Sequence, residues 1–355
     1  MKILSLYLPG FHKDKVNDEA WGNGFTEWDN VKNGKKLYKN HYQPFIPLNG
    51  FYDLSDKNKI EKQIDEANKY GVDGFIFYHY WFGNNKTALT KPAEILLKEI
   101  NKKIDFCFCW ANHSWLKNWI GNKNEIIVQQ TYGNKDEWIK HIEYLIPFFK
   151  DSRYLKINER PVLYIYNMSD IPDFQLMINI WNKKLKSENI KSLYIVEFIS
   201  SKNKKKNYKN SDSVVEFEPL YTTYFDISKF NLFKRFLSKK FNKIDFQDYN
   251  KLWKYNIKRK RTYDGTPIQK SCFVGWDNSA RKGYNCMIVK NNTPENFGKN
   301  LNLLINNNRK DASNDFLIIN AWNEWSEGAY LEPDKKNKYD YLNEIKKIRN
   351  DKKVE

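Results

Sequence analysis

The sequence predicts a (β/α)₈ barrel. Eight short runs of apolar, aromatic and β-branched residues alternate with helical patterns along the 355 residues. Strands separated by helices pair in parallel through crossovers, and eight such strands are the number that closes a barrel. The alternative is a doubly wound open sheet. That fold usually carries a glycine-rich phosphate loop after its first strand, where this chain has Pro9-Gly10-Phe11-His12.

Each expected strand is a short apolar run, and most end in aromatic or polar residues. The runs are Lys2–Pro9, Gly74–Trp81, Phe106–Asn112, Pro161–Asn167, Leu193–Ser200, Ser213–Pro219, Ser271–Asp277 and Asp315–Trp322. Helical patterns lie at Asp56–Tyr70, Pro92–Asn101, Asp136–Lys150, Asp173–Glu188, Pro294–Lys310 and Tyr341–Asn350. Several begin with an acidic N-cap or with Pro in the first turn, which are common start signals of helices.

Two long insertions interrupt this alternation within a single catalytic domain of residues 1–355. Residues 10–55 follow the first strand and are rich in Gly, Asn and aromatic residues. Residues 201–268 begin after the fifth strand and contain the sixth. From Ser228 to Arg261 this second insertion has 12 Lys or Arg against 2 Asp. Long connections inside compact domains are often functional.

The basic part of the second insertion predicts an amphipathic helix. Its apolar residues recur at helical spacing, namely Phe230, Phe233, Leu237, Phe241 and Ile244. We expect this helix to pack on the barrel with its charged face in solvent. The alternative is peripheral contact of residues 228–261 with an anionic membrane or a lipid-linked phosphate.

The composition narrows the classes of function. Aromatic residues make up 16% of the chain, which suits either sugar stacking or a large core. The net charge of +17 attracts anionic partners, but no nucleic-acid recognition motif accompanies it. The four cysteines, Cys107, Cys109, Cys272 and Cys286, lack zinc-site spacing and are expected in the core.

The sequence shows no membrane anchor. No run of about 18 apolar residues is present, so we expect no membrane-spanning helix. The opening MKILSLYLPG lacks a small-residue cleavage site, and we interpret it as the first strand of a cytoplasmic protein. The alternative of membrane contact would make the protein peripheral at the inner membrane face.

A pair of glutamates follows the last expected strand. The segment Asp315–Pro333 reads DFLIINAWNEWSEGAYLEP, with Glu324 and Glu327 three residues apart. In a continuous strand they would face opposite sides, but a turn at Gly328 would let them share a pocket. Two carboxyls in one pocket cannot both ionise freely, so one keeps a proton near neutral pH. Glycosidic chemistry requires that asymmetry. The alternative is two exposed glutamates in a loop.

Other strand ends carry groups of the kind that bind sugars. Hydroxyls, amides and flat ring faces at the carboxyl ends of barrel strands would line one mouth. The expected substrate-binding residues are Tyr7, His79, Tyr80, Trp81, Asn112, Trp115, Tyr166, Trp276, Asp277, Trp322 and Asn323. A lone buried histidine such as His79 is also common as a hydrogen-bonded structural residue.

Several motifs are missing from the sequence. There is no phosphate loop, no Gly-x-Gly-x-x-Gly, no Asp-x-Asp, no Gly-x-Ser-x-Gly and no His-Glu-x-x-His. We therefore predict no metal and no cofactor.

As a set, seven motifs spread over nearly the whole chain resemble one family. They are WGNGFTEWDNV (Trp21–Val31), HYQPFIPLNGFYDL (His41–Leu54), GVDGFIFYHYWF (Gly71–Phe82), CWANHSW (Cys109–Trp115), ERPVLYIYN (Glu159–Asn167), GWDNSAR (Gly275–Arg281) and AWNEWSEGAYLEPD (Ala321–Asp334). The family is that of the WbsX-like glycosyltransferases of bacterial surface-polysaccharide gene clusters. It is in turn similar to glycoside hydrolase family 99, the endo-α-mannosidases. The resemblance adds Glu27 and Trp28 to the expected substrate-binding residues.

The resemblance also implies roles for the paired glutamates. Glu327 would be the general acid/base at the glycosidic oxygen. Glu324 would engage the sugar 2-hydroxyl, which acts as an internal nucleophile in a retaining reaction. Ser326 departs from the hydrolases, which commonly have His at this position.

Three functions remain open. The first is a glycosyltransferase in O-antigen or capsule assembly that acts on a glycan or a lipid-linked glycan. The others are a retaining endo-glycosidase or transglycosidase, and a non-catalytic glycan-binding protein.

Overall fold

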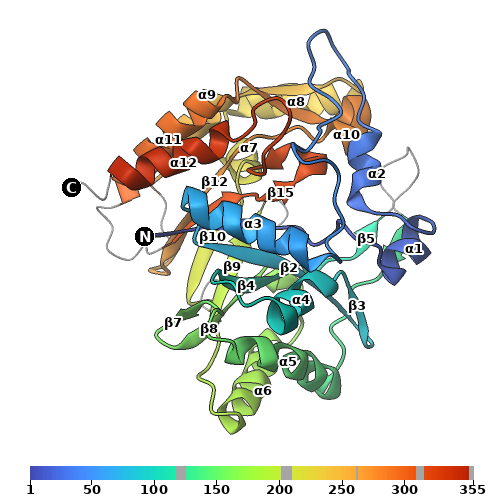
Figure 1. Ribbon diagram of the computed structural model, residues 1–355, viewed down its shortest axis with the longest axis vertical. Coiled ribbons are helices and arrows are strands. Elements are labelled where there is room, and N and C mark those ends of the chain that lie inside the picture. Colours follow the sequence, from blue (N-terminus) through green and yellow to red (C-terminus); the bar gives the residue numbers. More distant parts are fainter. Residues whose placement is uncertain (117–124, 201–209, 261–262, 309–315, 352–355) are drawn as a thin grey trace.

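The computed structural model describes residues 1–116, 125–200, 210–260, 263–308 and 316–351 (Figure 1). Within them, the barrel strands are β1 (Lys2–Tyr7), β2 (Gly74–Gly83), β4 (Asp105–Trp110), β8 (Arg160–Ile165), β9 (Tyr194–Ile199), β10 (Ser213–Glu216), β12 (Ile268–Phe273) and β14 (Phe316–Asn320). They pair in the order β1-β14-β12-β10-β9-β8-β4-β2, and β2 pairs back onto β1. The parallel barrel is closed, which confirms the predicted fold class.

The register shows how the barrel closes. Strand β1 pairs in parallel with β2 from Leu4 opposite Gly74 to Tyr7 opposite Phe77, and with β14 through Ser5 opposite Ile319. Strand β2 is buried along its whole length. Strands of a parallel barrel are covered by helices on one face and by the packed interior on the other, which is why they are nearly continuous apolar runs.

The long helices cover the outside of the barrel. They are α3 (Lys57–Tyr70), α4 (Lys91–Glu99), α5 (Lys135–Lys150), α6 (Phe174–Ser187), α9 (Tyr249–Lys258), α11 (Pro294–Asn308) and α12 (Asp340–Asp351). Helix α3 is typical: Ile60, Ile64 and Ala67 lie buried on one face, and the helix ends at Gly71 in the left-handed conformation. The six helices expected from the sequence are all present, with their ends within two residues of those expected; the expected end of the fifth at Lys310 lies outside the described residues.

Shorter elements lie in the connections. The helices are α1 (Lys15–Trp21), α2 (Glu27–Lys32), α7 (Leu220–Phe225), α8 (Lys229–Lys240) and α10 (Ser279–Lys282), with 3₁₀ turns at Met168–Asp170, Gly283–Asn285 and Trp325–Glu327. The strands are β3 (Lys86–Ala88), β5 (Trp115–Leu116), β6 (Ile126–Val128), β7 (Lys156–Ile157), β11 (Asp245–Asp248), β13 (Met287–Lys290), β15 (Asn323–Glu324) and β16 (Ala329–Tyr330). In Figure 1, α5 and α6 lie at the lower end of the molecule and α8 and α9 at the upper end.

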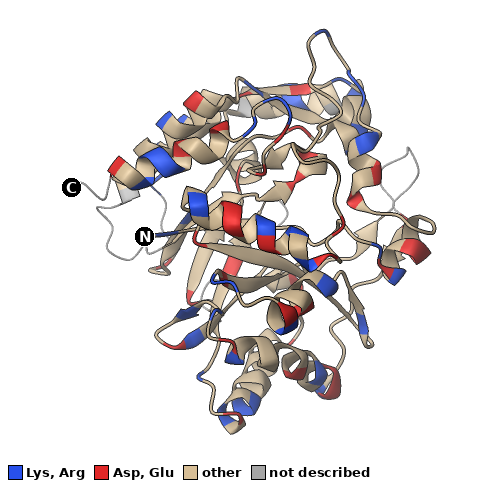
Figure 2. Cartoon of the chain, viewed as in Figure 1, with Lys and Arg blue, Asp and Glu red and all other residues tan. Residues whose placement is uncertain are grey.

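The second insertion contributes α7, α8, β11 and α9, and β11 pairs in parallel with β13. Residues 201–209 and Arg261 of this insertion, and Asp315 before β14, lie outside the described residues. Figure 2 shows Lys and Arg spread over most surface helices, often beside Asp or Glu. No helix among the described residues is long and apolar enough to cross a membrane.

The expected packing of the basic helix was wrong for its aromatic residues. Helix α8 contacts the core through Leu232, and Arg235 is buried beneath it. The side chains of Phe230, Phe233 and Phe241 are instead exposed, at 65%, 58% and 62% of their surface. The stripe that was expected to pack on the barrel therefore faces solvent, because the other face of the helix covers the barrel.

The cysteines behave as small core residues, as the sequence indicates. Cys107, Cys109, Cys272 and Cys286 are buried and form no disulfide. Burial raises the pKa of each thiol, which keeps the thiols protonated.

Candidate active site

The chain turns sharply after β14, and this turn brings the two glutamates together. The side chain of Asn323 fastens the segment to β1: its Oδ1 accepts from Leu8 N at 2.7 Å and its Nδ2 donates to Leu8 O at 2.9 Å. A single 3₁₀ turn, Trp325–Glu327, follows and ends at Gly328, which has a left-handed φ of 61°. Glu324 and Glu327 consequently line the same cavity.

This cavity, the glutamate cavity, has a volume of about 410 Å³ and lies at the carboxyl ends of the barrel strands. Aromatic side chains from distant parts of the chain line it, including Trp21, Tyr80, Trp115, Tyr166 and Trp276. Barrel enzymes carry their active sites at the carboxyl ends of the strands. Ring faces combined with a few charged groups form a site suited to a sugar.

Arg281 lies between the carboxyls that face the cavity. It follows β12 on the short helix α10. Its Nη1 donates to Glu327 Oε1 at 2.8 Å, and its Nη2 donates to Glu27 Oε2 at 2.8 Å and lies 4.0 Å from Glu324 Oε2. Burial would lower the pKa of Arg281, but the three carboxyls raise it above its ordinary value. The guanidinium is therefore a fixed positive charge.

Glu27 comes from the first insertion, at the start of α2. The absence of a side chain at Gly10 admits it, because a Cβ there would lie 2.9 Å from Glu27 Cγ. Ser326 Oγ also donates to Glu27 Oε2, at 2.7 Å. Burial raises the pKa of Glu27, but Arg281 and the hydrogen bonds outweigh burial and lower it. Glu27 is thus an ionised partner of Arg281.

Glu324 is in the opposite electrostatic situation. Its side chain is buried, and its Oε2 accepts no hydrogen bond from the described residues. Burial, followed by the charge of Glu327, raises its pKa to about 8, although Arg281 acts to lower it. Glu324 therefore holds a proton at neutral pH, whereas Glu327 is ion-paired. The two carboxyls thus lie in different electrostatic surroundings.

Trp276 lines the cavity and has an indole donor without an acceptor among the described residues. Only 3% of the residue is exposed, yet its indole Nε1 has no acceptor within the described residues. Buried polar groups are nearly always satisfied, so such an exception needs an explanation. A hydroxyl of a bound sugar is an acceptor of the right kind.

The structure brings part of the predicted set together in the glutamate cavity. Besides the two catalytic candidates, the predicted residues that line it are Glu27, Tyr80, Trp115, Tyr166 and Trp276. The remaining predicted residues have side chains that do not line it, and most have identifiable structural contacts instead.

Three of these residues make contacts around the ends of β1 and β14. Tyr7 is buried and its hydroxyl donates to Gln63 at 2.6 Å. The ring of Trp322 is buried 5.1 Å from that of Phe75. Asn323 holds Leu8, as described above. They support the turn that carries the glutamates.

Two more of them face the helix α5. His79 Nε2 lies 2.9 Å from His141 Nε2, and Trp81 stacks on the same His141 ring with centroids 4.5 Å apart. Burial lowers the pKa of His79 to about 3, so the imidazole is neutral. The structural interpretation of His79 that the sequence left open fits this geometry.

Asn112 and Trp28 join neighbouring segments. Asn112 Nδ2 donates to Asn167 O at 2.7 Å, which links the ends of β4 and β8. Trp28 Nε1 donates to Tyr52 O at 2.6 Å within the first insertion.

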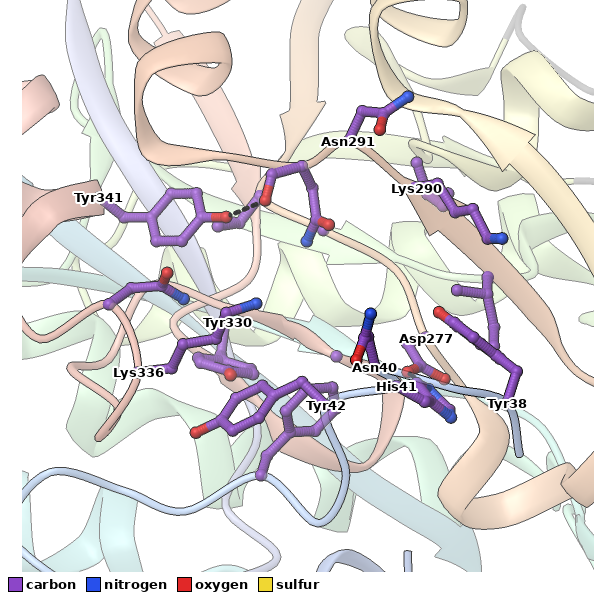
Figure 3. A pocket seen from close by; sticks show the side chains of 18 residues that line it. Tyr38, Asn40, His41, Tyr42, Asp277, Lys290, Asn291, Tyr330, Lys336 and Tyr341 are labelled. Carbon is purple, nitrogen blue, oxygen red and sulfur yellow. Dashed lines mark hydrogen bonds and ion pairs between the residues drawn. The ribbon is translucent and has the colours of Figure 1, made fainter. Parts of the chain in front are cut away.

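Asp277 lines a second cavity, which has a volume of about 280 Å³ (Figure 3). Its Oδ2 lies 2.7 Å from His41 Nε2 and accepts from Gln43 Nε2 at 3.2 Å. Its backbone N–H donates to Glu327 O at 2.7 Å. Asp277 therefore supports the turn that carries the two glutamates.

Sequence reasoning missed several residues that line the glutamate cavity. Arg281 belongs to the motif GWDNSAR and could have been singled out as its only cation. Arg235 and Asp245 come from the second insertion, and their Nε and Oδ2 atoms are 2.9 Å apart. Nothing in the basic segment indicated which of its residues would turn inward.

The described residues include no cluster of three or more His, Cys, Asp or Glu arranged to hold a metal ion. The acidic groups of the glutamate cavity surround a guanidinium instead.

The fold and the site define a closed parallel barrel with a cavity of carboxyls and aromatic rings at its strand ends. The chain belongs to the Glycosyltransferase WbsX family, which it matches over residues 3–345. The uncharacterized protein WxcX of Xanthomonas campestris pv. campestris is 29% identical over 343 residues, which are 96% of this chain and 48% of WxcX. The chain thus spans about half the length of the curated relatives that it matches.

Solved structures support the fold. A glycoside hydrolase-like protein superposes with a TM-score of 0.61 at 13% identity, covering 98% of this chain and 93% of the other. The GH99 endo-alpha-mannosidase of Bacteroides thetaiotaomicron superposes with a TM-score of 0.54 at 14% identity, covering 98% and 96%. At these identities the likeness concerns the architecture alone.

Proposed function

We propose that this chain forms or processes glycosidic bonds in the assembly of a bacterial surface polysaccharide, O-antigen or capsule, as a glycosyltransferase of the WbsX type. The observation that carries the proposal is the shared cavity of Glu324 and Glu327. One carboxyl there holds a proton, the other is paired with a fixed cation, and aromatic rings surround both.

The proposed chemistry uses one proton shared by the two carboxyls. The family resemblance gives the acid role to Glu327 and the 2-hydroxyl contact to Glu324, whereas the raised pKa of Glu324 favours the proton on that carboxyl. Coupled carboxyls titrate as a pair, so both arrangements hold the same number of protons. A sugar 2-hydroxyl that donates to Glu324 would favour the ionised form of that carboxyl and leave the proton with Glu327, beside the glycosidic oxygen.

Arg281, Trp276 and the ring faces would position the sugar. The guanidinium fixes the place of Glu327 through a charge-assisted hydrogen bond, which is shorter and stronger than a neutral one. The free indole N–H of Trp276 would donate to a sugar hydroxyl. Such fixed groups align the anomeric carbon with the carboxyls before reaction.

The alternative is a retaining endo-glycosidase or transglycosidase. The absence of an Asp-x-Asp motif from the sequence favours it, as does the architecture shared with the endo-alpha-mannosidase. A non-catalytic glycan-binding protein is a further alternative. A protein that only binds glycans would not require the raised pKa of Glu324.

A lipid-linked glycan as substrate would place the enzyme at the inner face of a membrane, with the rest of the protein in the cytoplasm. The basic residues 228–261 are the part of the chain that we propose for this peripheral contact.

The experiment is to incubate the protein with α-mannosides, and separately with sugar nucleotides and a lipid-linked acceptor, and to follow the products by mass spectrometry. Consumption of a sugar nucleotide supports the transferase, and release of free sugar supports the glycosidase. Glycan binding without turnover in either mixture would leave only the binding protein.

A further inference from the structure

Helix α8 has two faces of different character. Leu232 packs against the core, and Arg235 is buried in the wall of the glutamate cavity. At about 100° per residue, Phe230 and Phe233 point away from that buried face. Phe236 lies one turn after Leu232, at the edge of that face, and is 61% exposed.

Helix α8 and the residue that follows it expose four phenylalanine side chains. Phe230, Phe233, Phe236 and Phe241 are all about 60% exposed, at 65%, 58%, 61% and 62%. We call these four residues the phenylalanine face. Single exposed apolar residues, such as Leu176 on α6, are normal on soluble proteins, whereas a contiguous patch marks an interaction surface.

Lysine side chains lie among these phenylalanine rings. Helix α8 has no Asp or Glu in its sequence. Lys234 Nζ lies 4.5 Å over the ring of Phe230, and Lys240 and Lys243 are exposed. The two Asp between residues 228 and 261 do not offset these charges: Asp245 pairs with the buried Arg235, and Asp248 caps α9.

The combination identifies the kind of partner. A second copy of the chain would bring two surfaces of a protein with net charge +17 together. Rings that project from a helix and are interspersed with Lys are the features of helices that lie in the plane of a bilayer interface. Negatively charged headgroups complement the lysines, and the acyl boundary accepts the rings.

We propose that the phenylalanine face and its lysines dock this protein on the surface of an anionic lipid bilayer. Tyr224 lines the glutamate cavity, and the adjacent Phe225 is exposed. Docking through α8 thus sets a wall of the cavity at the level of the headgroups. In so far as the proposed function holds, the cavity receives the sugar of a glycan whose lipid stays in the membrane.

The test is flotation of the full chain with vesicles of phosphatidylcholine alone or of phosphatidylcholine with phosphatidylglycerol. We expect binding to the anionic vesicles at least about tenfold above the neutral ones, weakening as salt is raised. F230Q/F233Q/F236Q should lower binding at least about tenfold. The matched control L176Q, on α6 at the opposite end of the molecule in Figure 1, should leave binding unchanged.

The contribution of the lysines to membrane binding is tested with a separate pair of variants. K234Q/K240Q/K243Q should weaken binding to anionic vesicles, whereas K57Q/K59Q/K62Q, three exposed lysines of α3, should not. Equal weakening by both sets would mean that net charge alone drives association, and it would overturn docking through α8. So would a folded phenylalanine variant that binds like the wild type, or a wild type that ignores anionic vesicles and binds only a protein.

Membrane docking and the proposed catalytic function can be tested independently of each other. Glu324→Gln should bind vesicles normally while losing turnover. The phenylalanine variant should turn over a water-soluble glycoside normally but lose turnover of a glycan embedded in vesicles. Vesicle binding without any turnover would remove the proposed function and leave the docking surface standing.

Discussion

Arg281 donates to Glu27 at 2.8 Å although 254 residues of chain separate them. Through this contact the first insertion reaches the carboxyls at the end of β14, because the same guanidinium holds Glu327. The candidate site is therefore assembled from three distant parts of the sequence around one cation.

Loss of either catalytic candidate should remove activity. Glu327→Gln and Glu324→Gln keep the shape of the side chain but cannot exchange the proton, and general acid–base catalysis contributes about 10²–10⁴-fold. We expect kcat to fall by at least about 100-fold in both. Glu66→Gln, a change on α3 outside the cavity, should retain wild-type kcat. Full activity of Glu327→Gln would exclude that residue from the mechanism.

The pH dependence of activity should report the shared proton. The pKa of Glu324 is raised to about 8, so a reaction that needs the pair singly protonated loses rate as pH rises through about 8. Arg281 acts to lower this pKa. Arg281→Gln should therefore move the alkaline limb of kcat/KM to higher pH, besides reducing its height. A limb that stays in place or moves to lower pH would contradict this electrostatic assignment.

The free indole N–H of Trp276 should matter for glycan affinity. Trp276→Phe keeps the ring and removes the donor, so we expect Kd for the glycan to rise up to about tenfold, the worth of one hydrogen bond. Trp322→Phe is the matched control, because its Nε1 also lacks an acceptor in the described residues but lies outside the cavity. Titration calorimetry measures both. Equal effects of the two changes would mean that Trp276 does not contact the glycan.

Glu332 should make stability depend on pH. It accepts hydrogen bonds from Tyr52, Gln63 and Trp325, and burial raises its pKa to about 7. A group whose pKa is raised by folding stabilises the protein at low pH and loses that contribution as pH rises through the folded value. Between pH 5 and 8 the wild type should lose roughly 2 kcal/mol more unfolding free energy than Glu332→Gln. If the wild type and Glu332→Gln lost the same unfolding free energy between pH 5 and pH 8, this role of Glu332 would be disproved.

The buried cluster around Arg259 should be structural. This guanidinium pairs with Glu216, Glu218 and Asp226, and none of these four residues lines the glutamate cavity. Arg259→Met leaves three carboxyls without their cation, and we expect a loss of about 3–5 kcal/mol in unfolding free energy. Lys102→Met, which breaks an exposed pair, should cost no more than about 1 kcal/mol. Chemical denaturation compares the two.

The barrel could be predicted because each strand is a local pattern. Runs such as Gly74–Trp81 are apolar on both faces, and their number defines the closed sheet. The pairing of Glu324 with Glu327 was also local, since a strand end, a three-residue interval and a glycine predict a turn. Their role in catalysis remains a prediction.

Long-range contacts could not be predicted in the same way. The meeting of Arg281 with Glu27 depends on how the first insertion folds over the barrel, and no periodicity encodes it. Asp277 was expected beside the glutamates because it follows a strand, but its side chain turns to His41. For α8, spacing revealed an amphipathic helix and could not decide which face would meet the barrel.

Gly328 and Gly275 place two loops in backbone-to-backbone contact behind the glutamates. A Cβ on Gly275 would lie 2.8 Å from Gly328 O, and one on Gly328 would lie 2.9 Å from the Asp277 nitrogen that binds Glu327 O. Peptide groups rather than side chains thus fix the separation of the β12 and β14 loops. The spacing between Asp277 and the turn of Glu324 and Glu327 is consequently held by backbone contacts, independently of the rings that line the cavity.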